Sequence, residues 1–335
     1  MSTRLVAVSL ALIVASGFAI LGATAQSPGR GVDAHVAAAK AAAGTDFAGV
    51  FNRICAEAVP PSTPRAAAPR PTGPPLRSEW HAEPAKVFDN LYFLGQTEYS
   101  AWAVTTSAGI ILVDAIFDYS VDDEVVGGLK KLGLDPSTIK YVVVSHGHFD
   151  HSGGAKYLQD RFNARVILTA ADWDLLDKST QTRPRRDMVA TDGQKLTLGD
   201  TTLTLYNTPG HTMGTLSTLI PVTDHGTAHV AAAWGGTAFN WVANRAAYIT
   251  PDRPDRFWFE TYSASARRFK DITAKAGADV IIANHTIFDG SKTKLPALER
   301  RKPGDPHPYV IGTEGVQRYL TVVDECAQAG LARVQ

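Results

Sequence analysis

The chain has few cysteines and no excess of charge of either sign. Only two of its 335 residues are cysteines, Cys55 and Cys326, which excludes a metal site built from a cluster of thiolates. Its 33 basic and 33 acidic side chains cancel, so neither nucleic acid nor an anionic membrane surface has an electrostatic reason to bind it. The glycine-rich loop with a following lysine that binds nucleotide phosphates is also missing. With 44% hydrophobic residues, the composition is that of an ordinary globular protein.

Long apolar runs are lacking too, apart from Leu5–Leu21. Arg4 precedes this run and Ala23–Ala25 follows it, an order typical of a secretory signal peptide. We interpret residues 1–25 as a cleaved signal; an uncleaved membrane anchor is the alternative, although polar residues interrupt the run. The mature chain would then have no membrane contact and would be periplasmic or secreted. Because disulfides persist there, we expect the two cysteines to pair, two buried free thiols being the alternative.

Residues 26–85 have the composition of an N-terminal arm. Val32–Phe51 is rich in alanine and predicts a helix, whereas Val59–Pro75 has the proline content of an extended linker. Short β-rich runs and helical stretches alternate from residue 86 onward, which predicts sheets sandwiched by helices in one domain over residues 86–335. Strands are expected at 91–94, 101–105, 110–113, 141–144, 166–168, 201–206, 216–221, 228–233 and 280–283, and helices at 122–132, 154–162, 171–177 and 255–276. A last helix, capped by Thr313, is expected to bury Val316, Tyr319, Leu320, Val323 and Cys326.

The residues after strand 141–144 carry most of the chemical information. Within six positions they include His146, His148, Asp150 and His151. Imidazole nitrogens with a carboxylate oxygen suit zinc, or iron and manganese. The alternative is an exposed histidine-rich loop, but the whole chain has only ten histidines. Glycines in the loop allow it to curl so that two imidazoles converge on one ion, while Asp150 and His151 point elsewhere and predict a second ion nearby.

The spacing His146-x-His148-x-Asp150-His151 resembles the signature of the metallo-β-lactamase superfamily. Three further segments resemble motifs of that family in the same order: Ile110–Asp114, Tyr206–Thr215 and Ala283–His285. The resemblance covers roughly residues 86–290. It implies an α/β protein with the four-layer αβ/βα sandwich of this family and with the metals at one edge.

The resemblance also implies two Zn²⁺ per chain. The first would be held by His146, His148 and His211, and the second by Asp150, His151 and His285. A histidine at the place of His151, together with small residues where other members carry a bridging aspartate or a cysteine, is similar to the third subclass of zinc β-lactamases. Trp234 and Gly235 stand in the stretch where those members carry the bridging aspartate, and neither side chain can bridge two metal ions.

Further roles follow from the same resemblance. Asp150 would be the catalytic residue that orients the attacking water, and Asp114 would fix the orientation of a ligand histidine. Tyr99, Trp102 and Thr237 are the expected substrate contacts. The other five histidines of the chain are not expected to be ligands.

The expected activity is that of a secreted dizinc metallohydrolase whose zinc-bound hydroxide opens a cyclic amide. The first expected substrate is a β-lactam, which would make the protein an antibiotic-resistance enzyme. Its partner would be a small-molecule substrate. One alternative is a zinc hydrolase of the same fold that acts on an ester, a lactone or another small carbonyl compound. The other is a zinc-binding protein without turnover. The long N-terminal arm and the pair Gly235-Gly236 depart from the usual β-lactamase pattern and keep the substrate open.

Overall fold

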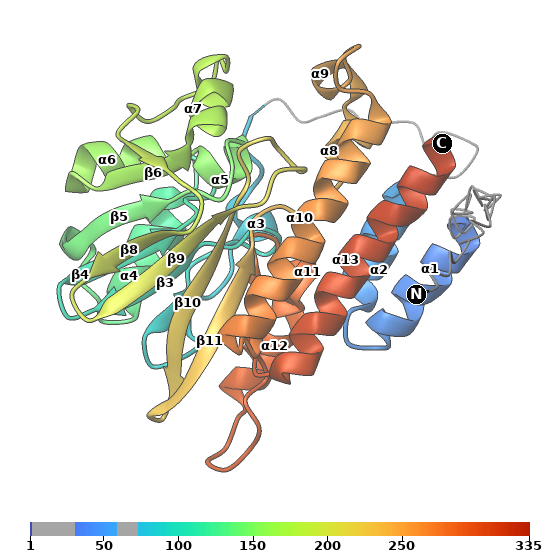
Figure 1. The fold of residues 1–335 in the computed structure, drawn as a ribbon. Coiled ribbons are helices and arrows are strands. Elements are labelled where there is room, and N and C mark those ends of the chain that lie inside the picture. The colour runs from blue at the N-terminus through green and yellow to red at the C-terminus, as the bar shows by residue number, and fades with distance from the viewer. Residues whose placement is uncertain (2–30, 59–72) are drawn as a thin grey trace.

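The computed structural model describes residue 1 and residues 31–58 and 73–335, and Figure 1 shows it as a ribbon. The predicted signal peptide, apart from Met1, and residues 59–72 of the predicted linker lie outside the described residues. Among the helices of the described part, none has both the length and the hydropathy that a bilayer span needs.

Two β-sheets form the centre of the molecule. The first has seven strands in chain order, β1 to β7, antiparallel up to β4 and parallel from β4 to β7. The second has the order β12-β11-β10-β9-β8, with β12 parallel to β11 and the others antiparallel. The strands are β1 Ala85–Lys86, β2 Leu91–Phe93, β3 Trp102–Thr106, β4 Gly109–Val113, β5 Ile139–Val143, β6 Arg165–Thr169, β7 Met188–Ala190, β8 Gln194–Leu198, β9 Thr201–Asn207, β10 Leu216–Asp224, β11 Thr227–Trp234 and β12 Val280–Ala283.

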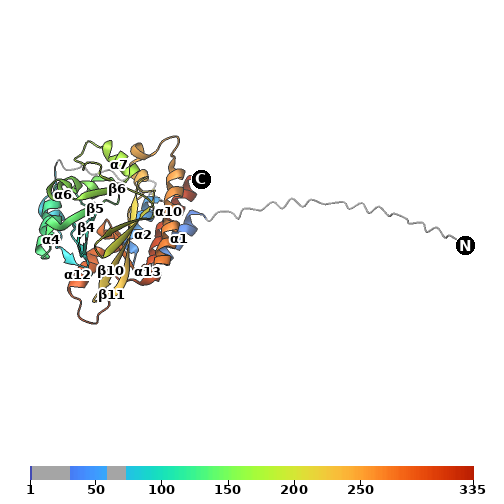
Figure 2. The same cartoon turned by 60° about the vertical axis from the view of Figure 1, so that its left-hand side comes forward.

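Helices cover the outer face of each sheet. They are α1 Val32–Ala43, α2 Ala48–Ala58, α3 Arg77–Trp80, the π-helix η1 Asp122–Gly127, α4 Gly128–Lys131, the 3₁₀-helix η2 Pro136–Thr138, α5 Phe149–Ser152, α6 Ala155–Phe162, α7 Ala170–Asp177, α8 Asn240–Ala243, α9 Arg245–Tyr248, α10 Asp255–Ala276, α11 Thr286–Asp289, α12 Ser291–Glu299 and α13 Gly312–Val334. Figures 1 and 2 show α4, α6 and α7 on one side of the paired sheets and α10 and α13 on the other.

Three apolar cores correspond to the three interfaces between four layers. One fills the space between the sheets and contains Trp102, Val143 and Leu205. A second lies under η1, α6 and α7, and the third joins the five-stranded sheet to α10 and α13. The predicted α/β class and the αβ/βα sandwich are therefore confirmed.

The two N-terminal helices pack on the C-terminal helix α13. Cys55 of α2 and Cys326 of α13 form a disulfide, which confirms the predicted pairing. The predicted apolar face of the last helix is buried, including Val316, Tyr319 and Cys326. Its predicted cap was misplaced: α13 begins at Gly312 after Ile311, so Thr313 lies inside the first turn.

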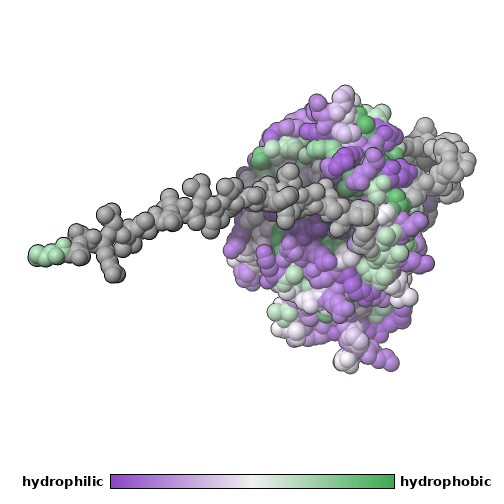
Figure 3. Space-filling model, turned by 45° about the vertical axis from the view of Figure 1, so that its right-hand side comes forward, coloured by the Kyte–Doolittle hydropathy of each residue, from purple (hydrophilic) through white to green (hydrophobic). Residues whose placement is uncertain are grey.

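The outer surface is mainly polar. On the face that Figure 3 shows, hydrophilic side chains predominate and hydrophobic ones are scattered among them. Beyond Met1, the exposed large hydrophobic residues of the described part are Leu76, Leu175, Val189 and Ile287.

Candidate metal centre

The loop that carries the histidine motif starts where β5 ends, beside the end of β4. Asp114 follows β4 in a left-handed conformation, with φ of 65°. Its carboxylate accepts hydrogen bonds from the Ser145 backbone N–H at 2.6 Å and from the Ser145 hydroxyl at 2.9 Å. Because β4 and β5 are parallel neighbours, their carboxyl ends lie side by side, and Asp114 fixes the start of the loop.

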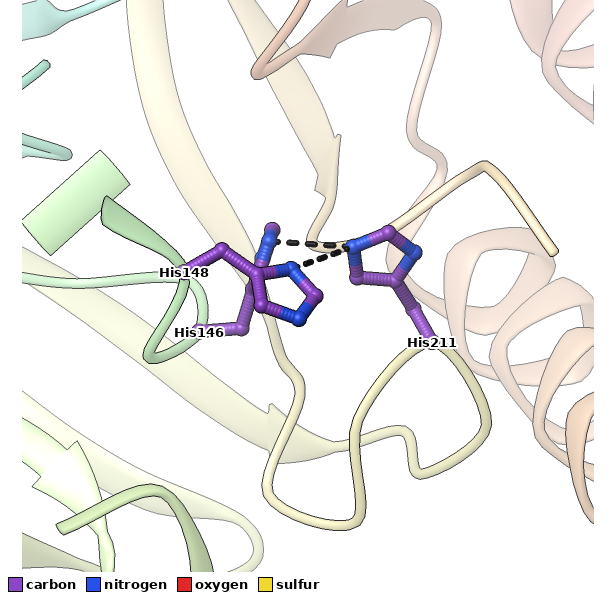
Figure 4. Close-up of side chains that lie close together, drawn as sticks. All are labelled: His146, His148 and His211. Atoms are coloured by element: carbon purple, nitrogen blue, oxygen red, sulfur yellow. Dashed lines mark hydrogen bonds between the residues drawn. The ribbon is translucent and has the colours of Figure 1, made fainter. Parts of the chain in front are cut away.

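Three histidines from two loops converge in a first cluster. Nε2 of His146 lies 3.0 Å from Nε2 of His211, and Nδ1 of His148 lies 3.1 Å from the same His211 atom. Figure 4 shows the three rings turned toward one another. One nitrogen of each ring therefore faces a common point, as metal ligands do.

The opposite ring nitrogens show which lone pairs face this point. Nδ1 of His146 donates to the Gly235 carbonyl at 2.9 Å, and Nδ1 of His211 donates to the Ala238 carbonyl at 2.6 Å. Burial lowers the pKa of His146 well below its usual value and that of His211 to about 4, so both rings are neutral. Their Nε2 atoms then carry lone pairs that face each other at 3.0 Å, which is repulsive unless a cation lies between them. The donor set therefore fits a metal ion.

His148 completes this cluster from the other side. Its Nε2 atom lies 2.7 Å from the hydroxyl of Tyr248 on α9. Burial lowers the pKa of His148 to about 3, so its ring is neutral as well. A tyrosine on a short helix outside the motif thus orients the third imidazole, and no sequence signal pointed to it.

A second cluster consists of Asp150, His151 and His285. Oδ2 of Asp150 lies 3.2 Å from Nε2 of His151 and 3.5 Å from Nε2 of His285, and the two ring nitrogens are 3.2 Å apart. Behind the cluster, Nδ1 of His151 lies 3.1 Å from Oδ2 of Asp114. The predicted supporting aspartate is therefore next to a predicted ligand.

The electrostatics of the second cluster favour positive charge. Burial alone would lower the pKa of His151, but the carboxylates of Asp150 and Asp114 outweigh it and raise the pKa to about 10. Burial would raise the pKa of Asp150, yet the charge of His151 holds it below the usual value. Burial lowers the pKa of His285 to about 3. A proton or a metal cation can supply the charge that the two carboxylates require.

Backbone close to the first cluster explains the pair of glycines after Trp234. A Cβ atom on Gly236 would lie 2.5 Å from Cβ of His211, and one on Gly235 would lie 1.8 Å from the Leu216 carbonyl oxygen. The same Gly235 carbonyl accepts hydrogen bonds from His146 and from Asn284. A larger residue at either place would displace this backbone from the histidines.

A cavity of about 350 Å³ opens over both clusters. Its wall consists of Arg53, Glu98, Tyr99, His148, Asp150, His211, Ala238, Asn240, His285, Ile287 and Phe288. A larger groove of about 810 Å³ lies beside α12 and includes none of the cluster residues. We therefore take the smaller cavity as the candidate reaction site.

The predicted substrate contacts differ in their positions. Tyr99 lines the cavity, and its ring centroid lies 5.0 Å from that of His285. Trp102 is buried between the sheets, where its indole N–H donates to the Ala283 carbonyl at 3.0 Å. Thr237 is 1% exposed and is not part of the cavity wall. The structure therefore brings Tyr99 to the site and leaves Trp102 and Thr237 in the interior.

Several residues at the site had not been predicted. Arg53 comes from the N-terminal arm, and Asn240 places its amide nitrogen 3.3 Å from both Nδ1 of His148 and Nε2 of His211. Asp172 on α7 accepts hydrogen bonds from Gly147 and from Thr212, one in each histidine loop. None of these positions belongs to a recognisable motif, since each depends on how distant segments pack.

Comparisons with known proteins agree with this geometry. Residues 94–226 match the metallo-beta-lactamase superfamily. A hydroxyacylglutathione hydrolase of Acidiphilium cryptum is 34% identical over 113 residues, which are 34% of this chain and 41% of that protein. An N-acyl homoserine lactonase of a Bacillus species is 31% identical over 103 residues, 30% of this chain and 40% of that protein. The chain thus matches about two fifths of the length of these curated relatives.

Solved structures match over a greater length. BJP-1, a subclass B3 metallo-beta-lactamase of Bradyrhizobium japonicum, superimposes with a TM-score of 0.63 and 25% identity, covering 73% of this chain and 91% of that one. The class B3 di-zinc metallo-beta-lactamase LRA-12 from an Alaskan soil metagenome has the same fold, with a TM-score of 0.60 and 18% identity, covering 79% of this chain and 100% of that one. The chain therefore contains a metallo-beta-lactamase domain, the fold of a superfamily of zinc hydrolases, as its histidine motifs indicated.

Proposed function

We propose that this protein is a secreted dizinc hydrolase that opens the cyclic amide of a β-lactam. The observation that carries the proposal is the pair of adjacent clusters, one of three histidines and one of Asp150, His151 and His285, on a single cavity. Zinc ions held by these two sets would act as Lewis acids and lower the pKa of a bound water toward neutrality. A histidine in place of a cysteine in the second set supports the comparison with subclass B3 enzymes.

Asp150 is the proposed proton carrier. It is ionised because positive charge beside it, from a proton on His151 or from a bound metal cation in its place, outweighs the effect of burial on its pKa. Its carboxylate therefore can accept a hydrogen bond from the attacking water, take its proton, and return that proton to the amide nitrogen when the ring C–N bond breaks. The proton balance closes within the site without a serine or cysteine nucleophile.

Asn240 and Tyr99 are the proposed contacts to the substrate itself. The Asn240 amide N–H₂ group faces the cavity next to His148 and His211, where it can donate a hydrogen bond to a carbonyl oxygen that gains negative charge. Tyr99 provides an aromatic wall beside His285. Asp114 keeps the His151 ring oriented from behind.

Export remains part of the proposal. The disulfide between Cys55 and Cys326 supports a periplasmic or extracellular location, because such bonds persist in oxidising compartments. We also propose the division into a signal at 1–25, an arm at 26–85 and the hydrolase domain at 86–335. In the folded protein the helices of the arm pack on that domain.

A second candidate activity is the hydrolysis of an ester, thioester or lactone. The curated relatives favour it, since a hydroxyacylglutathione hydrolase and a lactonase are more than 30% identical to parts of this chain. The same clusters and the same Asp150 would perform that reaction, with an oxygen or sulfur leaving group in place of nitrogen. Only the substrate distinguishes the two candidates.

The test is hydrolysis by the purified mature protein of a chromogenic cephalosporin, a penicillin, a carbapenem and an acyl lactone. Zinc content is measured in parallel, and each reaction is repeated after chelation and with Asp150→Asn. We expect about two zinc ions per chain and turnover of the β-lactams that chelation abolishes and the variant lowers by at least a hundredfold.

The control is His225→Asn, which replaces an exposed histidine on a hairpin, 85% exposed in its side chain, without touching either cluster. Its zinc content and turnover should equal those of the wild type. Turnover of the lactone alone would move the function to the second candidate. A protein without bound zinc would contradict both.

A further inference from the structure

One side of α2 faces the loops around the metal clusters, and Arg53 on this side lines the cavity. Gly49, Arg53 and Glu57 are each four residues apart, so they lie along one side of the helix. Val50, Ile54, Cys55 and Ala58 of the same helix are instead buried in the core. The first three residues therefore face the loops that surround the metal clusters.

Both ends of this face contact those loops directly. At Gly49 the helix approaches α11 so closely that a Cβ atom would lie 2.7 Å from the Ile287 carbonyl oxygen. At Glu57 a carboxylate oxygen accepts a hydrogen bond from the Phe239 N–H at 3.0 Å, next to Asn240. The Cys55 disulfide fastens the same helix to α13. The contacts at Gly49 and Glu57 thus fix the position of the helix on both sides of Arg53.

Arg53 brings a positive charge to the mouth of the cavity. Its Nε atom pairs with Glu57 at 2.7 Å, and 59% of its side chain is exposed. Among the described residues, Glu57 is the one carboxylate that pairs with Arg53. Arg53 lines the same cavity as Asp150 and His285, so the guanidinium lies on one wall with the second cluster.

Apart from the proposed metal ions, the rest of the cavity wall offers an anionic group no second positive charge. Among the described residues that form it, Arg53 is the only lysine or arginine. Glu98, on the same wall, is already paired with Lys292. A carboxylate on a substrate would match the planar fork of the guanidinium, which can donate two parallel hydrogen bonds.

We propose that Arg53 binds the carboxylate of the substrate, so that the site selects small anionic carbonyl compounds over neutral ones. This inference rests on the proposed hydrolase function and adds a specificity residue that comes from the N-terminal arm. It implies that the arm is part of the active site.

The first test compares a cephalosporin with its methyl ester, in which a neutral ester replaces the charged carboxylate. Arg53→Ala should raise KM about tenfold for the acid, with kcat nearly unchanged, and alter KM for the ester less than twofold. Arg53→Lys should recover part of the loss, because the charge returns without the fork. An equal change for acid and ester would overturn the proposal.

A matched control and a neighbouring variant exclude indirect effects. Arg256 forms the same kind of exposed pair with Glu260, four residues on, at 2.8 Å, and Arg256→Ala should leave both KM values unchanged. Glu57→Gln keeps an acceptor for the Phe239 N–H but removes the charge that competes for Arg53. We expect a lower KM for the acid in this variant. A rise like that of Arg53→Ala would show that Arg53 only supports Glu57.

A binding measurement keeps the question separate from catalysis. Calorimetry on the zinc-loaded protein would use the monohydroxamate of succinic acid and its methyl ester, which share one zinc-binding group. Arg53→Ala should weaken the acid about tenfold and the ester little. If the wild type hydrolyses none of the substrates, the proposed function fails, but the calorimetry still shows whether Arg53 binds a carboxylate. Equal affinities of the wild type for acid and ester would overturn the inference.

Discussion

At the scale of single residues, Asp172 joins the two loops that supply the first cluster. Its carboxylate accepts hydrogen bonds from the Gly147 N–H at 2.8 Å, the Gly214 N–H at 3.0 Å and the Thr212 hydroxyl at 2.8 Å. Gly147 lies between His146 and His148, and Thr212 follows His211 directly. A side chain that only accepts is required here, since every partner donates.

Asp172→Asn should therefore separate the loops. Its N–H₂ group must face at least one donor, so we expect a loss of about 1–3 kcal/mol in the free energy of unfolding and less zinc retained during dialysis. The measurements are urea unfolding and metal analysis. Asp174→Asn, on the same helix but exposed and paired with Arg186, is the control. If both variants kept zinc equally well, Asp172 would have no role in positioning the loops.

Asp289 gives a residue-scale prediction for pH. It is buried at the end of α11, where it accepts hydrogen bonds from the Ala283 N–H and the Ser291 N–H, each at 2.8 Å. Burial raises its pKa to about 6. Because the folded state binds this proton more tightly than the unfolded state, its contribution to stability is full below about pH 4 and is lost as the pH rises through 6.

The free energy of unfolding should accordingly carry a term that falls between pH 4 and 6.5, by up to about 3 kcal/mol. Asp289→Asn removes the titrating group and should flatten this part of the curve. Asp160→Asn, an exposed aspartate on α6, should leave the slope as it is. Identical slopes for wild type and Asp289→Asn in urea titrations would contradict the assignment.

At the scale of elements, the hydrophobic pattern of the sequence predicted the helices and strands whose own residues determine their conformation. The helix at 255–276 and the strand at 280–283 have the predicted bounds. An amphipathic stretch of this length indicates a helix, and a short, wholly apolar run indicates a buried strand. Strands β7 and β8 and helices α8, α9, α11 and α12 were not predicted. These are short segments whose shape depends on packing against the rest of the chain.

The residues of the candidate site likewise fall into those that a sequence motif predicted and those that only tertiary packing brings there. The six clustered residues were predicted because they belong to segments that resemble motifs of the metallo-β-lactamase superfamily. Arg53, Asn240, Asp172 and Tyr248 reach the site only through tertiary packing, and no local spacing relates them to the histidines. Trp102 was expected at the cavity because the family contacts its substrate with the corresponding loop, but Trp102 is the first residue of β3 and its side chain fills the core between the sheets.

The contact between α2 and α11 gives a prediction about an element. Gly49→Ala would place a methyl group against the Ile287 backbone, and a rigid neighbour cannot yield without moving a helix. We expect α2 to shift, with a loss of about 1–3 kcal/mol in the free energy of unfolding and a higher KM for anionic substrates. Asn52→Ala, an exposed position of the same helix, should do neither. Unchanged stability and KM in Gly49→Ala would show that the contact is not restrictive.

At the scale of the whole molecule, the N-terminal helices and α13 form one packed unit. Besides the disulfide, the Arg318 side chain donates to the Ala42 carbonyl at 3.0 Å, His35 contacts Glu325 at 2.7 Å, and the rings of Phe47 and Tyr319 meet edge to face. Residues from α1, α2 and α13 belong to the same apolar core as the five-stranded sheet. An arm that merely hung from the domain would make none of these contacts.

A chain of residues 86–335 with Cys326→Ser should therefore be less stable than the protein that retains the arm. Removal of the arm uncovers the apolar face of α13 and eliminates a cross-link worth about 2–5 kcal/mol. We expect a lower Tm and stronger binding of a hydrophobic dye. The full-length double variant Cys55→Ser, Cys326→Ser separates the two losses, since it lacks the bond but keeps the helices. If the truncated chain melted together with that variant, the helices would add nothing to the fold, and the hydrolase domain at 86–335 would be stable without the arm.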